Sequence, residues 1–471
     1  METTSAQFPA NVARALADPH LQYALTETGP RFIAKRAKAR EALPEFDALR
    51  DQARDIKDHV LAHLDIYLER YEAKVIATGG TVHWASGAEE ARAAILAICK
   101  RANAKIVTKG KSMISEEIDL NQALEAAGHI PVETDLGEYL IQLRNERPSH
   151  IIAPAVHLTR DQIEADFRRA HTHLDPNRDL REIPVLVEEA RKVLRQKYLD
   201  ADVGVTGANF LIAETGTSII VTNEGNGDLT QLLPRVHIVI ASIEKIVPTL
   251  EDASTILRVL ARSATGQDFA NYTTLSTGPR RAGDPDGPEE YHVVILDNGR
   301  SNVLGTEFQD MLRCIKCGAC LNHCPVFQAV GGHAYGSVYP GPIGSVVTPA
   351  LIGIEKARHL PNASTFCGRC EEVCPMRIPL PKMLRHWREK EFEQHLTPAS
   401  VRWGLGLWAF AAKRPRLYRF ATRFAARMLA GLGHGKGRIS SLPFASGWTA
   451  SRDFPAPQGK TFQQMWKERR Q

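Results

Sequence analysis

Apolar residues recur at three- and four-residue intervals along much of the first three hundred positions, which is the spacing of one face of a helix. In residues 49–73 this spacing is carried by Ile56, Val60, Leu64 and Tyr67. The same pattern predicts helices at 88–102, 116–127, 160–170, 183–199 and 250–262. These helices are long enough to cover the faces of a sheet.

Short apolar runs separate these helices and end at turn-forming residues, which is typical of buried strands. They lie at 81–85, 105–108, 129–133, 150–154, 203–205, 219–222, 236–241 and 291–296. Because strands and helices alternate, the sequence predicts a layered α/β domain. We place this domain at 49–300, after an N-terminal arm (1–48) that has only weak helical signals.

Length and composition narrow the class of protein. A chain of 471 residues predicts two or three domains, and its net charge of +5 says little about partners. No apolar run reaches the roughly 20 residues needed to span a bilayer. The first residues, METTSAQFPANVARAL, lack the basic start and apolar core of a secretory signal. We therefore expect a cytoplasmic protein.

The C-terminal segment, residues 385–471, is basic and aromatic, with no acidic residue from Gln394 to Arg452. Four arginines follow helical spacing in it: Arg416, Arg419, Arg423 and Arg427. This pattern predicts an amphipathic helical tail that lies on the anionic inner face of a membrane or docks on an acidic partner. Packing of its aromatic side chains on the preceding domain is an equal alternative. Nucleic-acid binding is not expected, because no recognition module accompanies the basic residues.

Seven of the eight cysteines lie in two short runs that both end in Cys-Pro. The first run contains Cys314, Cys317, Cys320 and Cys324, and the second contains Cys367, Cys370 and Cys374. The first has the spacing C-x2-C-x2-C-x3-C-P, in which three thiolates hold one iron–sulfur cluster and the fourth binds another. Zinc sites usually draw on two separated cysteine pairs, and disulfides are rare in the cytoplasm. The spacing therefore predicts an α-helical ferredoxin domain at residues 301–384 with two [4Fe–4S] clusters.

The crossing of the fourth cysteine in paired ferredoxin motifs predicts the ligands. Cluster 1 is expected to use Cys314, Cys317, Cys320 and Cys374. Cluster 2 is expected to use Cys324, Cys367 and Cys370, which leaves one ligand short. Ser364 occupies the slot of the missing cysteine. Because oxygen is a harder and weaker ligand for cluster iron than thiolate, the fourth iron is held by Ser364 or water, or is lost to give a three-iron cluster.

Several longer motifs resemble the lactate utilisation protein B family. They are KGKSMISEEI at 109–118, ETDLG at 133–137, GVTGANFLIAETG at 204–216, VTNEGNG at 221–227 and YGSVYPGPIG at 335–344. The resemblance covers essentially the whole chain. It implies an α/β domain of the NagB/ribose-5-phosphate isomerase/CoA-transferase type, followed by the two-cluster ferredoxin domain. It also implies an electron-transferring subunit in the oxidation of L-lactate to pyruvate, which works beside companion lactate-utilisation subunits.

Candidate catalytic residues lie in the α/β domain. Glu214 stands where the implied fold class can place a catalytic carboxylate. Asn223, Glu224 and Asn226 flank glycines whose backbone amides can hold a small acid or phosphate. Lys109 and Lys111 follow a predicted strand and precede a predicted helix, which suits an anion. Turns and solvated loops are the competing explanation for the same residues.

Three functions compete on the sequence alone. In the first, the chain relays electrons from a partner-assisted site to an acceptor such as a quinone or another membrane component. In the second, the α/β domain itself binds the hydroxy acid, and in the third the clusters are purely structural. No flavin or nucleotide motif is present, and hydroxy-acid oxidation ordinarily needs a two-electron acceptor. The relay is therefore favoured.

Overall fold

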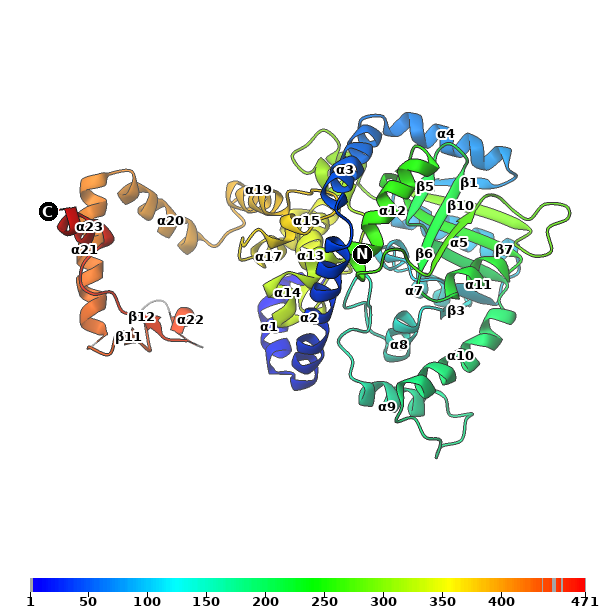
Figure 1. Cartoon of the computed structure of the whole chain (residues 1–471), viewed down its shortest axis with the longest axis horizontal. Helices are drawn as coiled ribbons and strands as arrows, with labels where there is room; N and C mark the ends of the chain where they lie inside the picture. Colours follow the sequence, from blue (N-terminus) through cyan, green and yellow to red (C-terminus); the bar gives the residue numbers. More distant parts are fainter. Residues whose placement is uncertain (1–2, 434, 443–445, 450–451, 471) are drawn as a thin grey trace. The chain divides into compact units, whose positions relative to one another are not determined.

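The structure, a computed structural model, describes residues 3–433, 435–442, 446–449 and 452–470. The chain divides into two compact units, Met1–Glu391 and Phe392–Gln471. The first unit holds a parallel sheet with helices on both faces, together with a helical segment that carries the two cysteine runs (Figure 1). The α/β layering predicted from the sequence is confirmed.

The central sheet contains six parallel strands in the order β1-β10-β7-β4-β2-β3. Their bounds are β1 Thr81–Ala85, β2 Ile106–Lys109, β3 Ile130–Glu133, β4 Val203–Gly207, β7 Val236–Ser242 and β10 Glu290–Leu296. In β7, Ile238 and Ile240 pack into one core cluster, while Val239 and Ala241 pack into another. Since side chains alternate between the faces of a strand, both faces of this sheet are buried.

Helices form the layers on the two faces. One face is covered by α5 Ala88–Arg101, α6 Met113–Glu117 and α7 Leu120–Ala126. The other is covered by α3 Phe46–Ala62 and α4 Leu64–Ala77. At the β3 edge, a separate apolar cluster joins α8 Leu136–Arg144, α9 Arg160–Ala170 and α10 Ile183–Leu199.

A smaller mixed sheet has the order β8-β5-β6-β9. Its strands are β5 Phe210–Ile212, β6 Thr217–Thr222, β8 Ile246–Val247 and β9 Tyr272–Ser276. The helix α11 Asn226–Leu232 and the 3-10 helix η2 Ile243–Lys245 connect the two sheets, whereas α12 Leu250–Ala264 connects β8 to β9 within the smaller sheet. The short η2 follows directly after β7, at the carboxyl edge of the central sheet.

The segment with the cysteines is made of short helices. They are η3 Ser301–Val303, η4 Gln309–Arg313, α13 Ala319–Asn322, α14 Pro325–Val330, η5 His333–Tyr335, α15 Gly341–Ile352, α16 Ile354–Ala357, α17 His359–Asn362, α18 Arg369–Glu372 and α19 Leu380–Glu393. Helix α14 starts at the proline that follows Cys324, where the missing N–H removes no helical hydrogen bond.

The N-terminal residues form η1 Ser5–Gln7, α1 Phe8–Ala17 and α2 Pro19–Glu41 rather than the weakly helical arm that we expected. These helices run beside the segment with the cysteines (Figure 1). The side-chain amide of Gln22 donates to Ala329 O (2.9 Å) and that of Asn11 donates to Ala334 O (3.3 Å). Contacts with a distant part of the chain stabilise these helices, and local sequence patterns do not reveal such contacts.

Three other local predictions differ from the structure. The helix expected at 49–73 is broken at His63, whose φ of −135° lies outside the helical range. The helix expected at 116–127 is split by Asp119, which has a left-handed backbone. The strand expected at 150–154 is a loop, because His150 Nδ1 accepts hydrogen bonds from the backbone N–H groups of Ile152 and Ala153 and closes a turn.

A buried ion network joins the α/β domain to the segment with the cysteines. Arg300, 2% exposed, donates to both carboxylate oxygens of Glu117 at 2.7 and 2.9 Å and lies 3.1 Å from Glu244 Oε2. The hydroxyl of Tyr339, which lies between the two cysteine runs, donates to Glu117 Oε2 at 2.5 Å. Burial raises the pKa of Glu117, but the Arg300 charge outweighs it and lowers that pKa below its usual value.

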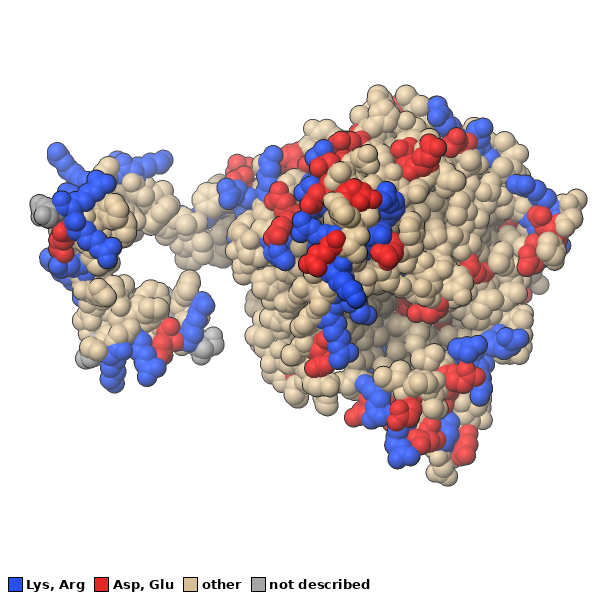
Figure 2. Space-filling model, in the orientation of Figure 1, with Lys and Arg blue, Asp and Glu red and all other residues tan. Residues whose placement is uncertain are grey.

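The second unit contains α20 Ala399–Ala412, α21 Pro415–Leu432, α22 Ser446–Thr449 and α23 Phe462–Arg470, with a short strand pair of β11 Arg438–Ile439 and β12 Phe454–Pro455. Neither α20 nor α21 has a buried residue, and Phe420 and Phe424 are 70% and 62% exposed. Figure 2 shows basic side chains on the visible face of this unit. Among the described residues, no helix is long and apolar enough to cross a membrane.

Candidate functional site

The two cysteine runs share one backbone turn. Lys316 and Gly318 have φ values of 59° and 73°, and Phe366 and Gly368 at the matching positions have 54° and 80°. In the first run, the backbone N–H of Lys316 donates to the sulfur of Cys314 at 3.4 Å. In the second run, the N–H of Phe366 donates to Ser364 Oγ at 3.2 Å. The Ser364 hydroxyl thus has the same local position as the first sulfur of the first run.

Four cysteines line one small cavity. They are Cys314, Cys317, Cys320 and Cys374, so the cavity combines the first run with the last cysteine of the second run. The rest of its wall is mainly apolar and includes Ile151 from the α/β domain and Ile343 from α15. A dry wall of this kind excludes water, which strengthens electrostatic interactions inside the cavity.

The charges of these thiols interact strongly. Burial, followed by the neighbouring Cys374 and Cys314, raises the pKa of Cys317 to about 12. Burial and the same neighbours raise the pKa of Cys320 well above its usual value. The backbone N–H groups of Ile378 and Met376 oppose this effect at Cys374. Four buried thiols therefore ionise together only where positive charge compensates them. Iron ions supply such charge, so this donor set fits an iron–sulfur cluster.

The other three cysteines of the runs form a second group. Burial, followed by Cys324 and Cys367, raises the pKa of Cys370 to about 12. The hydroxyl of Tyr335 lies next to the Cys324 thiol, and burial together with that thiol raises the pKa of Tyr335 well above its usual value. Cys367 is exposed, so this second group is more open to solvent than the first. Thiolates are soft ligands that suit cluster iron, but this group has three of them where a four-iron cluster needs four protein ligands.

Two arginines from the N-terminal helices hold the second cysteine run. The guanidinium of Arg50 in α3 donates to Cys374 O (2.7 and 3.1 Å) and to Glu372 O (2.7 Å), and Arg36 in α2 donates to Val373 O (2.8 Å). Sequence analysis missed both residues. The only signal for them was a basic residue in a predicted helix, and that signal is the same for a solvated helix face.

A larger cavity of about 260 Å³ lies at the carboxyl edge of the central sheet. The residues that follow β2, β3, β4 and β7 contribute to its wall, as do α12 and the end of β6. Ligands of parallel α/β sheets usually bind outside the carboxyl ends of the strands, and this cavity has that location. Lys316 and Ile151 line this cavity and also the small cavity with the four cysteines.

The sequence candidates in the α/β domain separate into two sets. The large cavity is lined by Lys111, Asn223, Glu224 and Asn226. Lys109 does not line it, because its ammonium is buried and paired with Glu116 (2.9 Å) and Glu133 (2.6 Å). These carboxylates raise its pKa against the effect of burial. Lys109 is therefore a structural cation rather than an open anion site.

Glu214 also lies away from the cavity lining. It is exposed in the turn between β5 and β6, where its backbone N–H donates to Pro248 O. The structure thus gives no support to the catalytic position that the resemblance implied for Glu214. Sequence analysis instead missed Lys245, which is 6% exposed and lines the cavity, because a lysine after a strand gives no specific signal.

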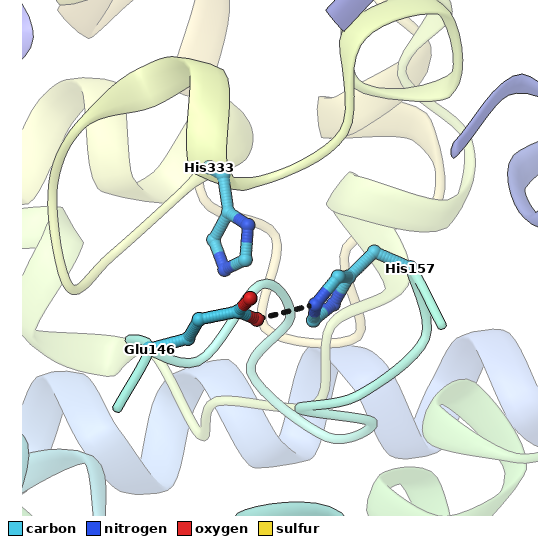
Figure 3. Close-up of side chains that lie close together, drawn as sticks. All are labelled: Glu146, His157 and His333. Atoms are coloured by element: carbon cyan, nitrogen blue, oxygen red, sulfur yellow. Dashed lines mark hydrogen bonds and ion pairs between the residues drawn. The ribbon is translucent and has the colours of Figure 1, made fainter. Parts of the chain in front are cut away.

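Glu146, His157 and His333 bring potential metal-ligating atoms within 4.8 Å of one another (Figure 3). Their polar atoms already have protein partners: His157 Nε2 pairs with Glu146 Oε2 at 2.9 Å, and His333 Nε2 donates to Arg147 O at 2.7 Å. Burial raises the pKa of Glu146, but hydrogen bonds from His157 and Arg144 lower it to about 2. This group is best explained as a polar junction between the α/β domain and the helical segment.

Comparison with known families divides the chain into three matches. The LUD domain matches residues 68–296, the 4Fe-4S dicluster domain matches 310–378, and the C-terminal region of lactate utilisation protein B matches 385–471. Both cysteine runs lie within the second match. The chain therefore contains an iron–sulfur domain of the 4Fe-4S type, as the cysteine spacing predicted.

Curated relatives match along the full length. Lactate utilization protein B of Bacillus licheniformis is 41% identical over 473 residues, which covers 100% of this chain and 98% of the relative. The protein of the same name from Macrococcus caseolyticus is 42% identical over 98% of this chain and 97% of its own. The uncharacterized electron transport protein YkgF of Escherichia coli K12 is 39% identical over 99% and 98%. A DUF162 family crystal structure from Deinococcus radiodurans matches at 19% identity over 50% of this chain and 98% of its own, with a TM-score of 0.26.

The contacts of Arg50 predict that its replacement lowers both the stability of the chain and its content of bound iron. Replacement of Arg50 by Ala removes charge-assisted hydrogen bonds to two backbone carbonyls of the second cysteine run, each worth about 1.5–3 kcal/mol. We expect a lower thermal midpoint and less bound iron and sulfide per chain in anaerobically purified protein. Arg54→Ala, one turn further along α3, removes partly exposed ion pairs with Asp51 and Asp55 but no hydrogen bond to the second cysteine run, and it serves as the matched control. Equal iron content in both variants would show that Arg50 does not stabilise the cluster segment.

Proposed function

The chain belongs to the lactate utilisation protein B family, and on that premise we propose that it is the electron-transferring iron–sulfur subunit in the oxidation of L-lactate to pyruvate. That oxidation releases two electrons and two protons from each lactate. A bound iron–sulfur cluster transfers single electrons, so two clusters suit the transfer from a two-electron donor. The observation that carries the proposal is the cavity lined by four cysteines from both runs.

We propose the following ligands. Cluster 1 uses Cys314, Cys317, Cys320 and Cys374, which line one cavity. Cluster 2 uses Cys324, Cys367 and Cys370, and Ser364 or water completes it. The shared turn supports the role of Ser364, because the same backbone N–H position donates to Ser364 Oγ and to the Cys314 sulfur.

We also propose that companion lactate-utilisation subunits accept the two electrons of lactate, through a flavin or an equivalent two-electron acceptor. The acceptor of electrons from the clusters is proposed to be a quinone or another membrane component. We further propose that the α/β domain is of the NagB/ribose-5-phosphate isomerase/CoA-transferase type. The parallel sheet with its ligand-sized cavity at the carboxyl edge is compatible with that class.

A second candidate function is favoured by one observation. Lys316 and Ile151 line both cavities, so a substrate in the large cavity lies close to the ligands of cluster 1. In this alternative the chain oxidises the hydroxy acid without a partner. The relay is preferred because lactate oxidation needs an acceptor for two electrons at once, and a single cluster takes one.

A reduction experiment separates the relay from the self-sufficient enzyme. Cubane clusters absorb visible light at about 400 nm. Under anaerobic conditions, L-lactate alone should not change this absorption in the cluster-loaded chain. Addition of the companion subunits should bleach it, since electrons then reach the clusters. Cys374→Ser is expected to reduce the bleaching strongly. Bleaching by lactate with the isolated chain would favour the self-sufficient enzyme instead.

The ligand scheme predicts different behaviour for the two clusters. Anaerobic protein should contain iron and sulfide without stoichiometric zinc, and brief exposure to air should convert cluster 2 to a three-iron form visible by EPR. Ser364→Cys is expected to suppress that signal, because a fourth thiolate retains the labile iron. Cys374→Ser should remove the signals of cluster 1. Loss of cluster 2 in Cys374→Ser, or two equally air-stable clusters in the unmodified chain, would contradict the scheme.

The arginines and exposed aromatic residues of α21 predict that the chain binds anionic membranes and that salt weakens this binding. Its arginines and its exposed Phe420 and Phe424 suit a lipid surface, where each basic residue contributes about 1 kcal/mol. Replacement of Arg416, Arg419, Arg423 and Arg427 by Gln should abolish sedimentation with acidic liposomes, whereas replacement by Lys should preserve it. Binding should also weaken as salt rises from about 0.05 to 0.5 M. Equal sedimentation of the Gln and Lys variants would exclude membrane docking through α21.

A further inference from the structure

The wall of the large cavity contains a largely buried lysine, Lys245, whose ammonium has no close partner among the described residues. Lys245 lies directly after β7, is 6% exposed and lines the cavity. Within the described part of the chain, its ammonium makes no hydrogen bond and no ion pair. Burial lowers the pKa of Lys245 to about 8, and the carboxylate of Glu244, which is already paired with Arg300, opposes this shift. Because an ammonium buried without a close counter-charge is costly, an anion in the cavity stabilises it.

A second polar group in the same wall is also unsatisfied. Asn226, which is 8% exposed and lines the cavity, has a buried side-chain oxygen with no hydrogen-bond partner among the described residues. Buried amide oxygens are nearly always hydrogen-bonded, and a hydroxyl group is a suitable donor. Lys111 adds a further cation to the wall, and the carboxylates of Asp135 and Glu224, which also line the cavity, offset its charge. Lys245 is therefore the cation available to a bound anion.

The remainder of the wall sets the size and character of the ligand. Ile220, Ile240, Leu260 and Ala264 supply apolar contacts. The volume of about 260 Å³ is just below the roughly 300–1,000 Å³ typical of small-molecule sites. A compact molecule with an anionic end, a hydroxyl group and a short apolar part matches these features.

The cavity also adjoins the proposed cluster 1. Lys316, between the ligands Cys314 and Cys317 in sequence, lines both cavities, and its ammonium lies 4.1 Å from the ring centroid of Tyr339. An anion bound here is close enough to affect the charge balance of the cluster. The alternative is that Lys245 only compensates the negative charge of cluster 1 and binds no ligand.

We propose that the large cavity is the binding site for a small 2-hydroxycarboxylate, with Lys245 pairing with the carboxylate and Asn226 with the hydroxyl group. The choice of a 2-hydroxy acid rests on the proposed function, but the presence of an anion site rests on the cavity alone. In this arrangement the chain contributes part of the substrate site, and the companion subunits contribute the two-electron acceptor. The sequence pointed to Asn226 through its neighbouring glycines, but it gave no signal for Lys245.

Calorimetry with the isolated, cluster-loaded chain under anaerobic conditions tests the site. L-Lactate is the probe, lactamide is its neutral counterpart, and inorganic phosphate is an unrelated anion. We expect lactate to bind at least tenfold more tightly than lactamide or phosphate. Lys245→Met should weaken lactate binding about 10- to 100-fold, since it removes a hydrogen bond to a charged group. Lys105→Met, which removes an exposed lysine outside the cavity wall, should bind lactate normally.

A second variant keeps the test valid if Lys245→Met folds poorly. Ala264→Phe fills the cavity from α12 without changing its charges, and it should abolish lactate binding while both clusters remain. The midpoint potential of cluster 1 provides another measurement. Bound lactate should shift it to more negative values, because a nearby anion favours the less negative, oxidised cluster. By linkage, lactate should bind more weakly after reduction.

The outcomes are distinct. Equal binding of lactate and lactamide, tighter binding of phosphate, or unchanged lactate binding in Ala264→Phe would each overturn the assignment. If Lys245→Met moves the potential of cluster 1 but leaves lactate binding intact, Lys245 serves only the charge of the cluster. Lactate-dependent bleaching in the presence of companions, combined with no binding to the isolated chain, would refute this inference and leave the relay standing.

Discussion

The buried guanidinium of Arg300 is the interaction on which the arrangement of the first unit depends. It follows the last strand of the central sheet and holds Glu117 from α6 and Glu244 from η2, and Glu117 in turn accepts from Tyr339. Removal of one partner from such a buried network typically costs about 3–5 kcal/mol, because the other charge is left uncompensated. The network therefore fixes the segment with the cysteines against the carboxyl edge of the sheet.

That attachment explains why two cavities of different character share part of their walls. Tyr339, held by Glu117, lies under the ammonium of Lys316, and Lys316 lines both the small cavity with four cysteines and the large cavity. The carboxyl edge of a parallel sheet is where ligands usually bind. A redox centre beside this edge is a suitable arrangement for coupling the charge of a bound ligand to the charge of a cluster.

The N-terminal helices complete the same assembly from the other side. Arg36 and Arg50 donate to the backbone of residues 372–374, so the cysteine contributed by the second run is held by helices more than 300 positions earlier in the chain. These contacts bury positive charge near thiols that repel one another when ionised. The second unit is a separate body with exposed basic and aromatic helices.

The sequence by itself determined the features that depend on near neighbours in the chain. Cysteine spacing specified iron–sulfur chemistry, and apolar periodicity located most strands and helices, because both patterns act over a few residues. Tertiary structure decided the rest. It paired Lys109 with carboxylates and turned the expected strand at 150–154 into a loop. It also placed Lys245 in a cavity wall, with no hydrogen-bonding partner among the residues that the structure describes. Lys109 and Lys245 both lie near the end of a strand, so the sequence does not distinguish them. Their roles are set by groups that only the folded chain brings near.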